Sequence, residues 1–122
     1  MRTHPVIRHP DPDDFRLLYP GLDKYTFNLD AVWIAVVDGD PAAGVILWDA
    51  GHSIVYGGDL MVREPYRHLG VGHALLAHVE RTLKAAGKNL LLATTSQIEM
   101  AYWAKKKGAG VLGPQFLIAW RM

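Results

Sequence analysis

The sequence predicts an α/β fold with one mixed β-sheet, and three observations indicate this class. Apolar segments of strand length recur along most of the chain, one longer segment has the period of an amphipathic helix, and that segment lies between two of the strands. Strand, helix and strand in this order make a parallel pair, whereas short turns between the earlier strands make antiparallel pairs. The 122 residues, half of them hydrophobic, suit one core and therefore a single domain over residues 1–122.

The first half of the chain carries the expected antiparallel part of the sheet. A short helix over residues 15–19, preceded by aspartates and ended by Pro20 and Gly21, separates the first strand from the second. Gly57 and Gly58 interrupt the long fourth strand, which predicts a bulge or a close backbone approach, and we expect the sheet to splay there. The strands, with a turn at 38–41 between the middle two, are expected at residues 6–8, 31–37, 43–48 and 53–62.

The second half begins with the most strongly patterned helix, over residues 70–86. Its apolar positions repeat with helical spacing, and Gly87 follows where a C-terminal cap belongs. A continuous apolar run over residues 90–94 is typical of a strand buried on both faces. The remaining expected elements are a second helix over residues 97–107, a strand segment at 111–112, a turn at 113–114 and a closing strand at 115–120.

The junction between the fourth strand and the first long helix has the features of an anion site. An apolar strand end is followed by a short loop, by Arg67, and by a helix that starts around Gly70 and Gly72. The first amide N–H groups of a helix have no intrahelical partner, and the helix dipole adds about half a positive charge there. Glycine permits a positive φ or a close approach of the backbone to a ligand. These residues predict a pyrophosphate-binding site.

Two better known glycine loops do not fit this junction. A P-loop places Lys-Ser or Lys-Thr after its last glycine, but His73 and Ala74 follow Gly72. The dinucleotide fingerprint needs a third glycine where Leu75 stands, and an acidic residue at the end of the next strand, where Thr94 stands. A nucleoside triphosphate and a dinucleotide are therefore disfavoured as the bound pyrophosphate.

The pattern Leu60-x-Val62, a loop with proline and tyrosine, and Arg67-x-x-Gly70-x-Gly72 resembles the acetyl-coenzyme A signature of the GNAT superfamily of N-acetyltransferases. The resemblance implies a GNAT-like fold whose central, mostly antiparallel sheet splays between the fourth and fifth strands and carries helices on both faces. It also implies acetyl-CoA as the acyl donor, with the pantetheine arm beside the strand end and the pyrophosphate at the helix start. The cofactor-binding residues implied in this way are Leu60, Met61, Val62, Arg67, His68, Leu69, Gly70, Val71, Gly72 and Gln97.

The catalytic residues depart from the pattern of the family. The tyrosine that usually serves as the acid would fall at Ala104 if Gly108 is the family's glycine, so Tyr102, two residues earlier, is the candidate acid. Asp59 is the first candidate for the base, because family members often keep a carboxylate nearby, most often at the position of Gly58. Asp59 can equally be a strand residue that faces solvent. The other candidates for the base are Tyr56, His52 and a water chain.

The resemblance implies an N-acetyltransferase that moves the acetyl group of acetyl-CoA to a primary amine. The chain has no cysteine, which excludes a cysteine acyl-enzyme, so we expect direct attack by the amine in a ternary complex. The alternative is a coenzyme A-binding regulatory or interaction module with degenerate catalysis, which the missing tyrosine favours.

Composition limits the other partners. A net charge of +1 gives no general reason to expect nucleic acid, and no apolar run reaches the roughly 18 residues that span a membrane, so neither partner is expected. His68, His73 and His78 are spaced by five residues, which spreads them around a helix, so no metal is expected. No export signal is visible, and the expected location is cytoplasmic.

The acceptor is expected to be a small-molecule or peptide amine. The resemblance implies that the segment before the central hairpin walls the acceptor site, and here that segment is short, about residues 10–30. A short wall fits an open site or a site completed by a second subunit. The edge of the closing strand at 115–120 offers a surface for a homodimer.

Overall fold

The computed structural model describes residues 4–22, 28–49, 51–95, 105–106, 110–112 and 116–121. The strands within these residues are β1 (Val6–Arg8), β2 (Val32–Val37), β3 (Asp40–Asp49), β4 (Ile54–Val62), β5 (Leu90–Thr95), β6 (Gly110–Leu112) and β7 (Phe116–Arg121). The helices are α1 (Pro12–Leu18) and α2 (Val71–Ala85), with short 3₁₀ helices η1 (Pro20–Leu22), η2 (Leu29–Ala31) and η3 (Glu64–Tyr66).

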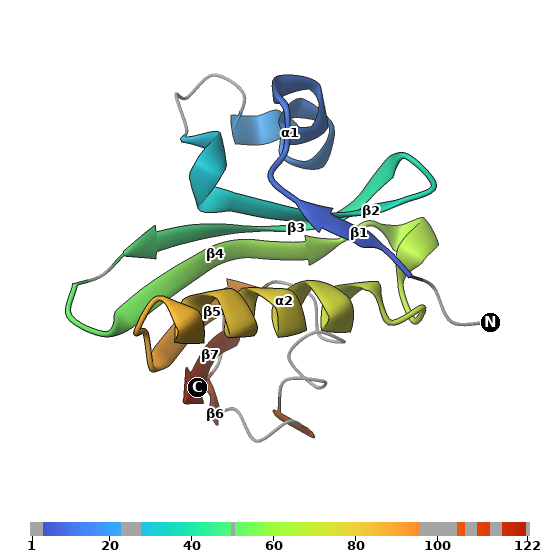
Figure 1. Cartoon of the computed structure of the whole chain (residues 1–122). Coiled ribbons are helices and arrows are strands. Elements are labelled where there is room, and N and C mark those ends of the chain that lie inside the picture. The colour runs from blue at the N-terminus through green and yellow to red at the C-terminus, as the bar shows by residue number, and fades with distance from the viewer. Residues whose placement is uncertain are drawn as a thin grey trace.

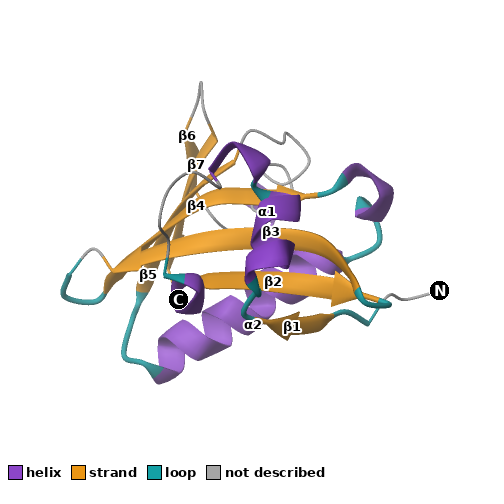
Figure 2. Ribbon diagram, turned by 90° about the horizontal axis from the view of Figure 1, so that it is seen from above, coloured by secondary structure: helices purple, strands orange, loops and turns teal. Residues whose placement is uncertain are grey.

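The described strands form one sheet in the order β1-β2-β3-β4-β5-β7-β6, with α1 and α2 on opposite faces (Figure 1). Only the β4–β5 pair is parallel, and the other neighbours are antiparallel. Figure 2 shows α1 above the middle strands and α2 beneath them. The predicted α/β class, with a mixed sheet and helices on both faces, is confirmed.

Helix α1 begins at Pro12, and the predicted start at residue 15 was wrong. The side chain of Asp11 accepts the N–H of Asp14 at 2.8 Å, and the side chain of Asp14 accepts the N–H of Asp11 at 3.0 Å. This reciprocal cap satisfies two amides of the first turn, and proline fits the first helical position because its missing N–H costs nothing there. The aspartates therefore open the helix instead of forming a turn before it.

The hairpin between β2 and β3 is tighter than the sequence predicted. Asp38 and Gly39, with φ of 49° and 79°, form a two-residue connection of the mirror-image type that matches the twist of paired strands. Asp40 and Pro41 already belong to β3, so the predicted four-residue turn was wrong. The ladder shifts register opposite Pro41, and such an irregularity tolerates a residue without a backbone N–H.

A β-bulge interrupts the pairing of β3 and β4. One β3 residue, Val45, lies opposite two β4 residues, Asp59 and Leu60, and Asp59 has a positive φ of 52°. The expected bulge is therefore present, directly after the two glycines. The expected close approach lies at Gly58, where a Cβ atom would be 2.5 Å from a ring carbon of Trp48.

The sheet splays where β4 and β5 part. Residues 54–57 of β4 pair with residues 90–93 of β5, after which β4 continues beside β3 and β5 continues beside β7. The predicted parallel pair and the predicted opening after Gly57 are both confirmed. The opening lies between the carboxyl ends of two parallel strands, which is where ligands bind in open α/β sheets.

Helix α2 closes both of its ends with glycine. Gly70 is the N-cap with φ of 81°, and Gly87 follows the C-cap with φ of 83°. The amides of Gly87 and Lys88 donate to carbonyls of the last turn at 3.0 and 2.9 Å, which is a Schellman motif. The apolar face of α2 packs on the sheet, and burying each such side chain stabilises the fold by about 1.5–3 kcal/mol. The residues of this face are Val71, Leu75, Leu76, Val79 and Leu83.

A second, smaller core lies between α1 and the other face of the sheet. Phe15, Leu18 and Tyr19 pack there against buried side chains of β2 and β3, with Ile34 and Ile46 at the centre. The short α1 covers the middle strands, whereas the ends of β3 and β4 extend beyond it (Figure 2). Of the helices within the described residues, α1 thus covers only part of this face.

The C-terminal strands correct one prediction. Strand β7 lies between β5 and β6, so the predicted sheet edge at the closing strand was wrong, and the outer strand is β6. The chain folds back after β6 and inserts its last strand beside β5. The predicted helix over residues 97–107 lies outside the described residues except for Lys105 and Lys106, which are helical. The turn at 113–114 lies outside them too.

Candidate active site

The loop between β4 and α2 presents a helix N-terminus at the opening of the sheet. The first helical hydrogen bond runs from the N–H of Ala74 to the carbonyl of Gly70, at 3.0 Å. The amides before Ala74 therefore belong to the first turn, which has no intrahelical acceptors. A Cβ atom at Gly70 would have no neighbour within 4 Å, so the position needs glycine for its positive φ and not because space is short. The space beside it is open to a ligand.

Arg67 is fixed beside this helix start. Its Nε donates to the carbonyl oxygen of Val62 at 3.0 Å, which ties the side chain to the end of β4. Within the described part of the chain no carboxylate forms an ion pair with Arg67. A full positive charge and the helix dipole therefore act on the same region, as an anion site requires.

Three side chains anchor the loop to the β2–β3 turn. Arg63 donates from Nη1 to the Asp40 carboxylate at 2.9 Å and to the carbonyl of Pro41 at 2.7 Å, and the Tyr66 hydroxyl donates to the other Asp40 oxygen. The hydrogen bond from Tyr66, more than the Arg63 charge, lowers the pKa of the Asp40 carboxyl, whereas Asp40 raises the pKa of Tyr66. The Asp40–Arg63–Tyr66 cluster fixes where the loop leaves β4. The sequence reasoning missed it because the partners are more than 20 residues apart.

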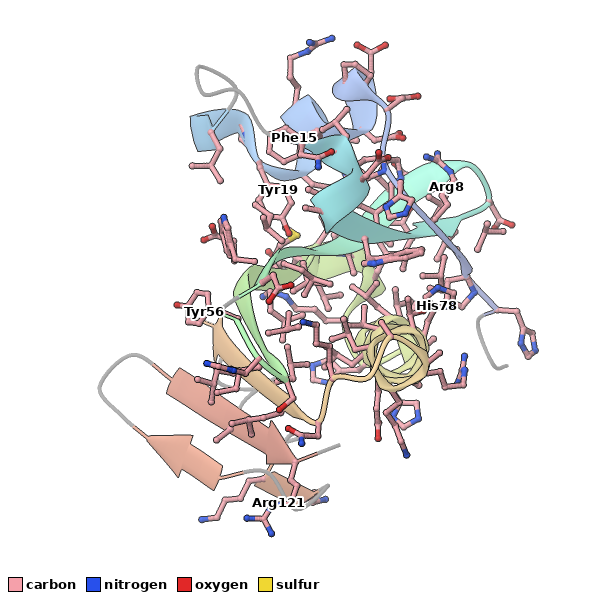
Figure 3. The ribbon with its side chains drawn as sticks, turned by 60° about the vertical axis from the view of Figure 1, so that its left-hand side comes forward. Arg8, Phe15, Tyr19, Tyr56, His78 and Arg121 are labelled. Carbon is pink, nitrogen blue, oxygen red and sulfur yellow. The ribbon has the colours of Figure 1, made fainter. Side chains whose placement is uncertain are left out.

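Tyr19 holds the bulge of β4 from the α1 face. Its hydroxyl donates to the backbone carbonyl of Asp59 at 2.8 Å, and Figure 3 shows the side chain reaching from the α1 layer toward the sheet. Burial raises the pKa of Tyr19 well above its ordinary value, and the Asp59 carboxylate raises it further, so the hydroxyl stays protonated as a donor. Gly44 makes room for it, because a Cβ there would lie 2.7 Å from the hydroxyl.

An aromatic pair lies on the same face, beside the bulge. Trp48 of β3 and Tyr56 of β4 are cross-strand partners with ring centroids 5.9 Å apart. The Trp48 ring covers Gly58, and 43% of Trp48 is exposed. A large exposed indole next to the opening of the sheet is a surface available to a ligand.

The structure brings most of the predicted cofactor residues to one place. Leu60 and Val62 point into the α2 core, Met61 packs on the α1 core, and the loop delivers Arg67 to the helix start. Of the remaining predicted cofactor residues, three are exposed in the loop: His68, Leu69 and Gly70. Two are buried at the start of α2: Val71 and Gly72.

The candidate catalytic residues are only partly placed. Asp59 is exposed on the bulge, and Tyr56 lies three residues before it on β4. His52 is exposed in the turn before β4, at the end of that strand away from α2's N-terminus. Gln97, Tyr102 and Ala104 lie outside the described residues.

Two further features concern the described residues alone. They hold no group of three or more His, Cys, Asp or Glu side chains that could bind a metal ion. They also hold no helix of the length and apolarity that crossing a membrane requires.

The fold is a splayed mixed sheet, and the site at its opening consists of a helix N-terminus and an arginine. The sequence model of the Acetyltransferase (GNAT) family matches residues 3–108, and the chain therefore belongs to this family. Comparison with curated proteins gives no match.

Solved structures of low sequence identity share the fold. Ard1 from Thermoplasma volcanium has a TM-score of 0.78 and 14% identity, with 97% of each chain covered. A GNAT family acetyltransferase from Elizabethkingia anophelis with acetyl-CoA bound has a TM-score of 0.73 and 18% identity, covering 97% of this chain and 98% of that one. An N-acetylglutamate synthase from Neisseria gonorrhoeae, complexed with coenzyme A and L-arginine, has a TM-score of 0.77 and 15% identity. The whole chain aligns with 34% of that synthase.

Proposed function

We propose that the protein is an N-acetyltransferase that transfers acetyl from acetyl-CoA to a primary amine in a ternary complex. The observation that carries this proposal is the opening between β4 and β5 with Arg67 and the N-terminus of α2 beside it. Membership of the acetyltransferase (GNAT) family and structural neighbours that hold coenzyme A or acetyl-CoA support it.

The proposal assigns a part of coenzyme A to each group of residues at the opening. The backbone of Leu60, Met61 and Val62 would lie along the pantetheine arm, and the amides from His68 to Gly72 would meet the pyrophosphate. Arg67 adds the positive charge, and the open space at the Gly70 Cβ position leaves room for phosphate oxygens. Gln97 completes the proposed set.

The residues that act on the amine follow from its chemistry. A free alkylamine has a pKa of about 10.4, so its neutral form is disfavoured at pH 7 by roughly 4.6 kcal/mol. We assign Asp59 to hold the ammonium and accept its proton, because it is an exposed carboxylate at the opening. Acetyl-CoA supplies an activated thioester, and Tyr102 is the proposed proton donor to the departing thiolate. No cysteine is present to form an acyl-enzyme, which supports direct attack.

A coenzyme A-binding module without efficient catalysis is the second candidate. One observation favours it, because Ala104 stands where the family pattern has a tyrosine acid. Both candidates share the cofactor site, so only turnover separates them.

Turnover is tested by incubating the protein with acetyl-CoA and a panel of primary amines, and by measuring free thiol and acetylated product. The proposal expects amine-dependent thiol release above the rate without protein, and a lower rate for Asp59→Asn. Binding of acetyl-CoA without release for any amine supports the module instead.

The proposal also includes the class of acceptor, the oligomeric state and the location in the cell. We expect a small-molecule or peptide amine, a cytoplasmic protein, and no nucleic acid or membrane partner. If a homodimer forms through the sheet, the outer strand β6 is its site, since β7 is enclosed by its neighbours.

A further inference from the structure

We propose that Trp48 and Tyr56, together with the proposed base Asp59, form the acceptor subsite: the reacting nitrogen lies at Asp59, and the two rings take a second positive charge of the same aliphatic amine. The inference rests on the proposed function and adds the class of acceptor. It concerns the part of β3 and β4 around the bulge and the Trp48–Tyr56 pair.

The position of the aromatic pair connects it to the opening of the sheet. Tyr56 pairs with both Trp48 of β3 and Leu92 of β5, one residue before the last β4–β5 pair. The Trp48 ring covers Gly58, the first β4 residue beyond that pairing. The pair therefore lies at the closed end of the opening, at the opposite end from Arg67 and the start of α2.

Asp59 directly follows Gly58, the β4 residue that the Trp48 ring covers. Its charge acts on the hydroxyl of Tyr19, which belongs to the α1 core, and the hydroxyl binds the Asp59 carbonyl at 2.8 Å. Tyr19 and the positive φ at Asp59 fix the backbone that presents this carboxylate. No lysine or arginine of the described residues forms an ion pair with it, whereas Asp49 at the end of β3 is paired with Lys88 at 3.0 Å.

The two aromatic rings suit a cation. Indole is the strongest side-chain partner for a cation over its ring, and the negative charge of Asp59 further along β4 favours a cationic acceptor over an anionic one. The 43% exposure of Trp48 leaves its ring open to such a group. An acceptor that carries a carboxylate would meet Asp59 unfavourably.

A series of five-carbon amines with one variable end group tests the charge. The KM for 1,5-diaminopentane should be about tenfold below that for pentylamine, and 5-aminopentanoate should have the highest KM. Equal KM values, or the reverse order, overturn the proposal.

Variants of the aromatic pair separate recognition of the cation from plain packing. Trp48→Leu keeps an apolar side chain but loses the ring, so it should raise the KM for the diamine about tenfold and leave that for pentylamine nearly unchanged. Trp48→Phe should recover part of the preference. Gly58→Ala places a Cβ against the Trp48 ring, whose outer end can move, so it should copy the effect of Trp48→Leu. Leu17→Ala, at an exposed α1 residue, is the matched control without effect.

A binding measurement keeps the subsite testable without turnover. If acetyl-CoA binds but no amine is acetylated, the proposed function fails, and the diamine is then titrated calorimetrically into the coenzyme A complex. Binding that Trp48→Leu abolishes supports the subsite, and no binding to the unaltered protein overturns it. If Trp48→Leu weakens the binding of all three five-carbon amines equally, the proposal is also overturned.

Discussion

At the scale of single residues, Tyr19 connects α1 to the bulge that carries Asp59. It is a buried donor with one geometrically defined acceptor, the Asp59 carbonyl at 2.8 Å. As the C-cap residue of α1, Tyr19 links the end of the helix to the shape of a strand through one side chain. The bulge, in turn, decides where the exposed carboxylate stands.

Tyr19→Phe should reduce the free energy of unfolding by about 1 kcal/mol, because it leaves the Asp59 carbonyl without this donor while the ring contact with Phe15 is retained. Urea unfolding measures the change. The acetylation rate should fall with it, while the affinity for coenzyme A stays the same. Unaltered stability and rate would show that the bulge does not depend on this hydrogen bond.

His78 is the residue with the clearest pH signature. Its Nε2 is buried and finds no hydrogen-bond partner among the described residues, and its ring lies 4.7 Å from that of Trp33, between α2 and β1 (Figure 3). Burial lowers its pKa below 6.5, and the charges of Arg81 and His9 lower it further. Because the folded state disfavours the proton, this contribution to stability is complete above pH 6.5 and is lost as the pH falls through the lowered pKa.

His78→Phe should flatten the dependence of stability on pH between about pH 6.5 and 5, since it keeps the ring against Trp33 and removes the titrating group. Denaturant unfolding of both proteins at pH 8, 6.5 and 5 gives the slope of the free energy of unfolding against pH. The lowered pKa values of Asp14 and Asp40 act below the ordinary carboxyl value of 3.8 and so outside this window. Identical slopes for the two proteins would contradict the assignment.

The local part of the site could be predicted from sequence, and the long-range part could not. Arg67, Gly70 and the strand end before them lie within one short segment, so their spacing carries the information. Tyr19 and Asp40 contribute through contacts with residues 40 and 26 positions away, which no periodicity encodes. The strained conformation of Asp59 likewise follows from a register shift against β3.

At the scale of elements, the loop between β4 and α2 depends on its anchor to the β2–β3 turn. The side chains of the Asp40–Arg63–Tyr66 cluster are half-buried and partly screened by solvent, so the contribution of their ion pair to global stability is small. Its effect is local, because it sets the path of the loop toward Arg67 and the helix start.

If the loop between β4 and α2 binds the pyrophosphate as proposed, Tyr66→Phe should weaken the binding of coenzyme A by about twofold to fivefold, since one anchor of this loop is lost. Binding of pantetheine, which has no pyrophosphate, should stay the same. Calorimetric titrations with both ligands measure the difference. Equal weakening of the two would show that the cluster acts on the fold and not on the phosphate loop.

The bounds of an element that carries its own sequence pattern were predicted closely. The place of a strand in the sheet, which depends on its pairing partners, was not. Helix α2 has a complete apolar face and a glycine at each end, so its predicted bounds differ from the observed ones by one residue at each end. The start of α1 was misplaced because Asp11 and Asp14 suit a turn as well as a cap. The place of β7 inside the sheet depends on which strands pair, which the order of segments alone leaves open.

At the scale of the whole molecule, we propose that the splayed sheet separates the binding of the acyl donor from that of the acceptor. The carboxyl end of β4 and the start of α2 present backbone and positive charge, which suit a pyrophosphate. Further back on β3 and β4, the rings of Trp48 and Tyr56 and the exposed carboxylate of Asp59 suit a cationic amine. The two surfaces meet where β4 and β5 part, so a donor and an acceptor bound to them would meet there.

The most direct test of this account is a thermal melt with acetyl-CoA, free coenzyme A or NAD, each at about one hundred times a plausible dissociation constant. Binding at that ratio stabilises the folded state by about 2.7 kcal/mol, which raises the Tm of a domain of this size on the order of 10 °C. The account predicts this rise with both forms of coenzyme A, a smaller rise for Arg67→Gln, and none with NAD. No rise with either form of coenzyme A would contradict it.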